Sequence, residues 1–259
     1  MRPVLLALGP FKLYGYGAMI VLGGILSFGF LKTRAAKVGF RSDDDFWLFV
    51  NVILGSGFLG GRFLFLFEYT RWFSPQFWRT MFSLNEGFSV LGAFAGVPLG
   101  VWLFCRARKV PFLRLLDTVC VMAPFWHVFG RLGCFLAGCC HGRPTTVPWA
   151  VTFTDPRAMV PPEWLGTPLH PAQLYEAAGD GLIAAVLFVV LRRTEDRPAG
   201  LVAAGYFAAY GVLRAFLENY RGDTVPGAFG LTAGQGLGLG LIAASAGLLA
   251  WRKACSRPS

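Results

Sequence analysis

The stretch LLDTVCVMAPFWHVFGRLGCFLAG, residues 115–138, decides the fold. It is as long as a bilayer crossing, which needs about 20 residues, and it has no polar face of the kind that a soluble helix presents to water. Because hydrocarbon offers no water to its backbone groups, we expect a membrane-spanning helix. The same stretch holds His127 and Arg131 and runs into GRLGCFLAGCCHGR, residues 130–143. Such polar residues at membrane depth indicate a functional site.

The rest of the chain repeats this apolar pattern. Of its 259 residues, 55% are hydrophobic and only 15% are charged, and the mean hydropathy is +0.54. A soluble helical core would need polar faces that the apolar blocks lack. We therefore predict an all-α integral membrane protein with seven transmembrane helices in a single membrane domain, residues 1–259. The predicted spans are Tyr14–Leu31, Phe46–Phe67, Phe88–Cys105, Leu115–Gly138, Pro171–Leu191, Leu201–Tyr220 and Leu231–Trp251.

The net charge of +10 is distributed in a pattern typical of a membrane protein. Cations gather in the segments after the first, third, fifth and seventh spans, and no basic tail or aromatic-basic groove suggests a nucleic-acid partner. The positive-inside bias predicts an N-terminus outside the cell and a cytoplasmic C-terminus. The cations concerned are Lys32, Arg34, Lys37, Arg41, Arg106, Arg108, Lys109, Arg114, Arg192, Arg193, Arg197, Arg252, Lys253 and Arg257.

Two long loops, residues 68–87 and 141–170, are expected to form small outward-facing appendages. In the first, aromatic side chains match the preference of such rings for the headgroup layer, although plain loop packing is the alternative. They are Trp72, Phe73, Phe77 and Trp78. In the second, WAVTFTDP, residues 149–156, is expected to contain a short strand. The N-terminal segment does not read as a cleavable signal, because Lys12 interrupts it and no small-residue cleavage site follows.

Ionisable residues converge on one depth of the predicted bundle. His127, Arg131 and Cys134 are spaced i, i+4, i+7, which places them on one helical face. Arg214, Glu218 and Arg221 repeat that spacing, and further polar residues lie near the same outer ends: Tyr14, Tyr16, Arg62, Gln173, Glu176 and Asp180. Any one of these groups could snorkel or form a structural ion pair, such as Arg214 with Glu218.

Convergence from several helices favours a binding site over separate structural pairs. The arginines outnumber the carboxylates if Arg62 is included, so we expect guanidinium groups to be free for an anion. Guanidinium suits planar, multidentate capture of phosphate. A phosphate held in the outer half of a bilayer points to a phospholipid headgroup.

Six ordered motifs give the chain a resemblance to the prolipoprotein diacylglyceryl transferases, bacterial membrane enzymes with seven transmembrane helices. The resemblance covers about Leu8 to Ala243. The motifs are LGPFKLYGYGAM (8–19), LGGRFLF (59–65), GRLGCFLAGCCHGR (130–143), HPAQLYE (170–176), YGVLRAFLENYRGD (210–223) and the GQ of residues 234–235.

The resemblance implies transfer of a diacylglyceryl group from phosphatidylglycerol to the lipobox cysteine thiol of lipoprotein precursors, with release of glycerol phosphate and without a cofactor. It implies a multi-pass enzyme of the bacterial cytoplasmic (inner) membrane, surrounded by membrane lipids, with its active site toward the outer leaflet. We assign catalytic roles to Tyr16, Arg214, Glu218, His170 and His141, the two histidines as candidate proton acceptors. Substrate-binding roles are assigned to Arg131, Arg143, Arg62, Arg221, Gln173 and Tyr175.

The chain departs from the family pattern at several polar positions. Leu91 stands where many members carry a histidine, and a leucine cannot move a proton. Cys134 and Ala137 replace asparagines, and Cys139 replaces an acidic residue. The alternative hypothesis is therefore a diverged relative that binds phospholipid, or performs thiol chemistry, without transfer to precursors.

The cysteines leave several interpretations open. Cys134, Cys139 and Cys140 form a possible thiol site: they could fill space, form a disulfide from Cys134 to either neighbour, or supply a catalytic thiol. We expect no metal, because the spacing C-x4-C-C-H lacks the paired clips of structural zinc sites. The remaining cysteines, Cys105, Cys120 and Cys255, are expected to be packing residues.

Overall fold

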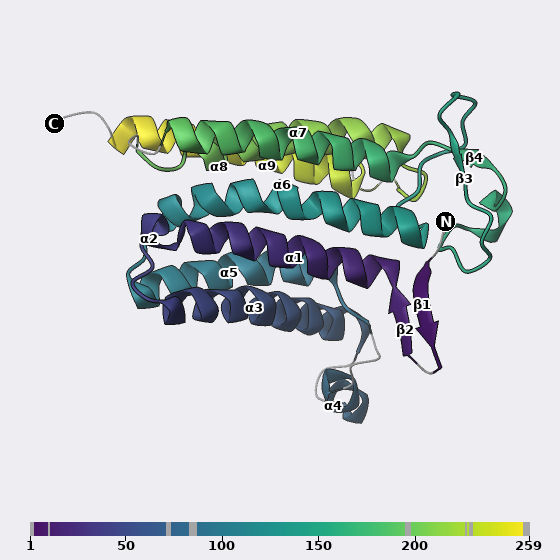
Figure 1. Ribbon diagram of the computed structural model, residues 1–259, viewed down its shortest axis with the longest axis horizontal. Helices are drawn as coiled ribbons and strands as arrows, with labels where there is room; N and C mark the ends of the chain where they lie inside the picture. Colours follow the sequence, from purple (N-terminus) through teal and green to yellow (C-terminus); the bar gives the residue numbers. More distant parts are fainter. Residues whose placement is uncertain are drawn as a thin grey trace. The chain divides into compact units, whose positions relative to one another are not determined.

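A computed structural model describes residues 3–9, 11–70, 74–82, 87–194, 198–225, 227 and 230–255 (Figure 1). Helices dominate these residues. They are α1 (Gly15–Thr33), α2 (Ala35–Val38), α3 (Asp43–Tyr69), α4 (Pro75–Phe82), α5 (Val90–Arg108), α6 (Phe112–Ala137), α7 (Ala172–Arg193), α8 (Leu201–Leu217) and α9 (Ala233–Cys255). Short 3₁₀ turns at Pro162–Trp164 and Glu218–Tyr220 complete the helical structure.

The predicted all-α membrane fold is confirmed. Within the described residues, six helical segments are long and apolar enough to cross a membrane: α1, α3, α6, α7, α8 with its 3₁₀ extension, and α9. Helix α5 has 19 residues and coincides with the third predicted span, but it is not among the six. The boundaries of the predicted spans differ from those of the helices by only a few residues. Seven crossings and the orientation of the chain stay predictions.

Two small antiparallel sheets accompany the helices. Strand β3 (Val151–Thr152) pairs with β4 (Pro168–Leu169), which confirms the strand expected within residues 149–156. Strands β1 (Val4–Leu8) and β2 (Phe11–Tyr14) form an N-terminal hairpin that the sequence analysis did not predict. Tyr14 therefore ends a strand instead of opening the first span. The residues of this hairpin are almost uniformly apolar, so they lack the alternation that signals a half-buried strand.

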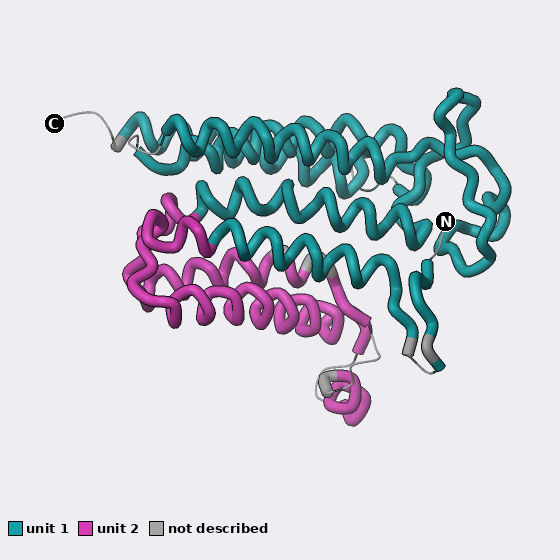
Figure 2. Tube along the Cα trace, in the orientation of Figure 1, with its two compact units in different colours: residues 1–31, 116–259 teal, residues 32–115 magenta. Residues whose placement is uncertain are grey.

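The chain divides into two compact units, residues 1–31 with 116–259 and residues 32–115 (Figure 2). The first unit contains the β1–β2 hairpin, nearly all of α1, most of α6, and everything that follows. The second contains α2 to α5. The predicted site residues fall in the first unit, apart from Arg62, and so does the cysteine cluster; Leu91 lies in the second unit.

Small residues and buried side chains hold the first unit together. A Cβ at Gly211 of α8 would lie 2.7 Å from the carbonyl oxygen of Gly238 in α9, so these two helices approach at backbone distance. Such approach is the usual way for membrane helices to gain packing contacts. Trp126 of α6 reaches α1, where its Nε1 donates to the Ile20 carbonyl at 2.9 Å. The buried Asp117 carboxylate accepts hydrogen bonds from the first amides of the α8 segment, Gly200 N at 2.7 Å and Ala203 N at 2.8 Å.

The two ends of the first unit differ in structure: one carries the arginines that end α7 and α9, and the other carries the folded segment between α6 and α7. At one end, Arg252 Nη2 donates to the Pro198 carbonyl at 2.5 Å, near the arginines that close α7. At the opposite end, the segment between α6 and α7 folds around its own small core of Phe153, Val160 and Leu169. Figure 1 shows this segment and the sheet β3–β4 beside the start of α7. This end carries the predicted site.

In the second unit, three buried rings, Phe40, Phe49 and Phe104, pack with centroids 5.2–5.7 Å apart. Predicted interfacial residues Phe77 and Trp78 lie on α4, the first buried and the second exposed. Trp72 and Phe73 lie outside the described residues, as do the predicted loop cations Arg197 and Arg257. The membrane contacts of these residues stay predictions.

Candidate active site

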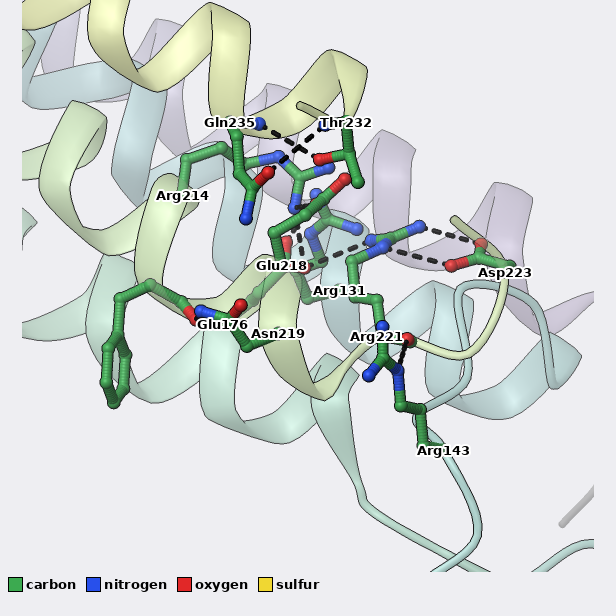
Figure 3. Close-up of polar contacts among 11 residues, drawn as sticks. Arg131, Arg143, Glu176, Arg214, Glu218, Asn219, Arg221, Asp223, Thr232 and Gln235 are labelled. Carbon is green, nitrogen blue, oxygen red and sulfur yellow. Dashed lines mark hydrogen bonds and ion pairs between the residues drawn. The ribbon is translucent and has the colours of Figure 1, made fainter. Parts of the chain in front are cut away.

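Glu176, in the first turns of α7, is the centre of the polar cluster. Its carboxylate is buried and contacts arginines from α6, from α8 and from the segment just beyond α8. Arg131 Nη2 of α6 lies 2.5 Å from Glu176 Oε2, and Arg221 Nη1, just beyond α8, lies 3.0 Å from Oε1. Arg214 Nη1 of α8 is 3.5 Å from the same Oε1. One carboxylate thus holds three guanidinium groups from separate parts of the chain, as Figure 3 shows.

The expected pairing of Arg214 with Glu218 is confirmed. Arg214 Nη1 lies 2.7 Å from Glu218 Oε2, at the i, i+4 spacing read from the sequence. Both side chains press against the start of α9, where a Cβ at Gly234 would lie 2.3 Å from Glu218 Oε2. Only glycine fits there without displacing the ion pair. The start of α9 is itself fixed, because Thr232 and Gln235 exchange side-chain to backbone hydrogen bonds of 3.1 and 3.2 Å.

Arg221 is tied to a further carboxylate that the sequence analysis missed. Its Nε and Nη2 donate to Asp223 at 3.0 and 2.7 Å in a two-pronged contact (Figure 3). Arg143 Nε donates to the Arg221 carbonyl at 2.9 Å. Among the described residues no carboxylate pairs with the exposed Arg143. The sequence feature that could have identified Asp223 is its position two residues after Arg221, in the YRGD of residues 220–223.

Each arginine of the inner cluster is paired with a carboxylate. Arg131, Arg214 and Arg221 face Glu176, Glu218 and Asp223. The expected surplus of free guanidinium groups is therefore not found among these three arginines, because Asp223 adds a carboxylate to the three that the sequence showed, Glu176, Asp180 and Glu218. Arginine donates up to five hydrogen bonds from a flat fork, and a carboxylate uses only some of them. The cluster thus presents spare N–H donors at fixed positions without a large excess of charge.

The three histidines occupy different environments. His170, partly exposed, has its Nδ1 3.2 Å from the Tyr175 hydroxyl, which also accepts a hydrogen bond of 2.6 Å from Trp149 Nε1. His141 is buried, with its ring edge-on to Trp164. His127 lies within the α6 span, its Nδ1 3.9 Å from Asp180 Oδ2. Of the two expected proton acceptors, His170 has the more accessible imidazole.

Tyr16 and the cysteines border the arginines. Tyr16, in the first turn of α1, is 45% exposed, and its hydroxyl lies within electrostatic range of Arg131 and of the three cysteines. Gln173 is buried, and its Nε2 donates to the Cys139 carbonyl at 2.8 Å. Cys134, Cys139 and Cys140 are free thiols. These predicted residues therefore meet at the same end of the first unit as the arginines.

Two positions from the sequence analysis belong to the second unit. Arg62 Nη1 donates to the Gly87 carbonyl at 2.7 Å, and its Nη2 contacts the Thr80 carbonyl. Its guanidinium thus fixes backbone near α4 and the start of α5, and its assigned contact with substrate stays a prediction. Leu91 lies in the first turn of α5.

Comparison with known proteins gives the family. The family model described as Prolipoprotein diacylglyceryl transferase matches residues 3–251. The chain belongs to this family. Relatives named phosphatidylglycerol–prolipoprotein diacylglyceryl transferase include one from Clostridium tetani, 37% identical over 86% of this chain and 86% of its own length. Others are from Solidesulfovibrio magneticus, 35% identical over 96% and 94%, and Methylocella silvestris, 34% identical over 96% and 93%.

Membership of the prolipoprotein diacylglyceryl transferase family agrees with the resemblance seen in the motifs. Three of those motifs supply the inner cluster: residues 130–143 contribute Arg131, residues 170–176 contribute Glu176, and residues 210–223 contribute Arg214, Glu218 and Arg221. Segments far apart in this transferase-family chain thus build one site at the end of one unit.

Proposed function

We propose that the protein transfers the diacylglyceryl group of phosphatidylglycerol to the lipobox cysteine thiol of lipoprotein precursors. The single observation that carries the proposal is the gathering of Arg131, Arg214 and Arg221 around Glu176 at one end of the bundle. The names of the family and of its relatives supply the substrates. A fixed set of N–H donors matches the phosphate of the lipid better than its neutral acyl chains.

In the proposed reaction, the precursor thiolate attacks the carbon of the diacylglyceryl group that is bonded to the phosphate oxygen. A carbon–sulfur bond forms, the carbon–oxygen bond breaks, and glycerol phosphate leaves with the electron pair. The arginines offset the charge that develops on the departing phosphate oxygen, which is the role of preorganised donors in transfer reactions. Exposed Arg143 makes the first contact with the headgroup, and Glu176, Glu218 and Asp223 hold the inner guanidinium groups in position.

The thiol proton goes to His170 in this proposal. Neutral imidazole accepts protons near physiological pH, and the Tyr175 hydroxyl orients the ring. The His170 amide donates to the Arg143 carbonyl at 2.9 Å, so the base and the arginines are joined through one short backbone link. A leucine at position 91 is then compatible with activity, because the proton goes to His170 and not to a side chain at position 91.

The test is rescue of a bacterium depleted of its own transferase, combined with a reconstituted assay. Phosphatidylglycerol labelled in its acyl chains and a lipobox peptide are the substrates, and a peptide with serine in place of the lipobox cysteine is the control. We expect growth rescue and label on the cysteine peptide only. A chain that binds the lipid but transfers nothing would overturn the proposal and favour the diverged-relative alternative.

A further inference from the structure

Three thiols meet where α6 ends. Cys134 lies in the last turn of α6, and Cys139 and Cys140 follow in the turn that leaves it. Their Sγ atoms all lie within 4.8 Å of one another. Two residues with positive φ, Gly138 at +80° and Cys140 at +55°, reverse the chain and return Cys140 toward Cys134. A left-handed backbone is unusual for a residue other than glycine, so the position of Cys140 is imposed by its surroundings.

The surrounding structure holds this turn in place. Gly138 N donates to the Cys134 carbonyl at 2.8 Å, and Gln173 Nε2 of α7 donates to the Cys139 carbonyl at 2.8 Å. Gly222 N donates to the His141 carbonyl at 3.0 Å, which joins the turn to the segment after α8. The sulfur atoms are therefore brought together by a preorganised loop and not by a flexible end.

All the candidate ligand atoms in this group are sulfur. Within the part of the chain that the structure describes, no histidine nitrogen or carboxylate oxygen joins the three sulfur atoms of this group. Thiolate ligands select soft metal ions such as Cu⁺ and Zn²⁺, whereas Mg²⁺ and Ca²⁺ require oxygen. A metal–sulfur bond is about 2.3 Å, so one ion can bridge sulfur atoms at these separations after a small contraction.

Arg131 lies one helical turn before Cys134 on the same face of α6, so a positive charge borders the sulfur atoms. Metal binding requires thiolates, and the arginines offset part of the negative charge that three thiolates bring. The expectation of no metal depended on sequence spacing alone. The fold brings the Sγ atom of Cys134 close to those of Cys139 and Cys140, and the spacing of the three residues along the sequence does not show this proximity.

We propose that Cys134, Cys139 and Cys140 form a three-thiolate site for a single soft metal ion of the Zn²⁺ or Cu⁺ class. Cu⁺ is satisfied by three sulfur ligands, and Zn²⁺ keeps a fourth position for water. The site borders the arginines without using them as ligands. It goes beyond the proposed transfer reaction and does not depend on it.

The experiment uses the full chain in detergent micelles, purified with reductant and chelator and then transferred to chelator-free, oxygen-free buffer. Zn²⁺ or Cu⁺ is added against a chromophoric chelator, and thiolate-to-metal charge-transfer absorption and bound metal are measured. Mapping of alkylated peptides reports which cysteines the metal protects. We expect one ion per chain and protection of these three cysteines.

Substitutions separate this site from adventitious binding. Binding should be lost in Cys139→Ser and Cys140→Ser, whose side chains are partly exposed, and retained in Cys105→Ser, which changes a buried cysteine of the second unit. Equal binding in all variants, binding without cysteine protection, or no binding would overturn the proposal. So would a disulfide from Cys134 to Cys139 or Cys140 in chains alkylated directly in the membrane. If a variant fails to fold, the protection pattern of the parent chain decides.

Discussion

Arg131 and Arg214 contact the central carboxylates from α6 and α8, and lysine at either position keeps the charge while losing the planar fork. We expect Arg131→Lys and Arg214→Lys each to lower transfer from phosphatidylglycerol by well over about tenfold, since a single ammonium cannot hold both a carboxylate and a phosphate in fixed geometry. The measurement is label transfer to a lipobox peptide. Arg193→Lys, exposed at the other end of α7, is the matched control and should keep full activity. Unchanged turnover in both variants would remove the arginine cluster from the mechanism.

Glu176 carries the opposite charge and offers a second residue-level test. Glu176→Gln leaves its arginines without their shared carboxylate, and breaking a buried ionic network from one side costs about 3–5 kcal/mol. We expect a clearly lower melting temperature in detergent. Added phosphatidylglycerol should restore more of that stability than phosphatidylcholine, because its net negative charge replaces the lost carboxylate. Equal effects of the two lipids would argue against an anion site at this position.

His170 and His141 are distinguished by their surroundings. His170→Ala removes a partly exposed imidazole next to Tyr175, so we expect transfer to fall by about 10²- to 10⁴-fold, the usual contribution of a general base, with lipid binding unchanged. His141→Ala removes a buried ring that packs on Trp164, and its main effect should be a lower melting temperature. Transfer rates, lipid affinity and melting temperatures of both variants check this contrast. Equal transfer rates in His170→Ala and the parent chain would show that His170 is not the proton acceptor.

At the scale of elements, α8 depends on a cap supplied by another helix. The Asp117 carboxylate of α6 accepts from Gly200 N and Ala203 N, two amides that have no helical partner of their own. Asp117→Ala should therefore cost about 1–3 kcal/mol of stability, the penalty for buried donors left unsatisfied. Asp117→Asn, which keeps an amide oxygen, should cost less. Thermal unfolding of the two variants in one detergent tests the order, and a reversed order would contradict the capping role.

At the scale of the whole molecule, the distribution of cations predicts the orientation. Reporter fusions in the loop after α5, near Arg108 and Lys109, should read cytoplasmic, and fusions within residues 141–170 should read external. The structure places the arginines of α7 and α9 at the end of the first unit opposite the active-site cluster, which agrees with this pattern. The reversed result would place the site at the cytoplasmic face and contradict the expected position of the active site toward the outer leaflet.

The sequence by itself determined the helical membrane fold and most of the site. Apolar runs of spanning length leave helix as the only stable backbone, so the helices lie where hydropathy predicted them. The i, i+4 spacing likewise brought Arg214 to Glu218, because helical geometry alone decides that contact. The motifs of residues 130–143, 170–176 and 210–223 predicted which further residues would gather, and these residues meet at one end of the first unit.

Contacts between distant segments were decided only by the tertiary structure. The Glu176 carboxylate contacts three arginines, and Asp223 pairs with one of them. These contacts depend on how α6, α7 and α8 pack, and the spacing of residues along the chain does not encode that packing. The same holds for the three sulfur atoms. Cys134 is separated from Cys139 and Cys140 by a turn whose left-handed residues redirect the chain, so their proximity depends on backbone dihedrals and on the Gln173 hydrogen bond that fixes them.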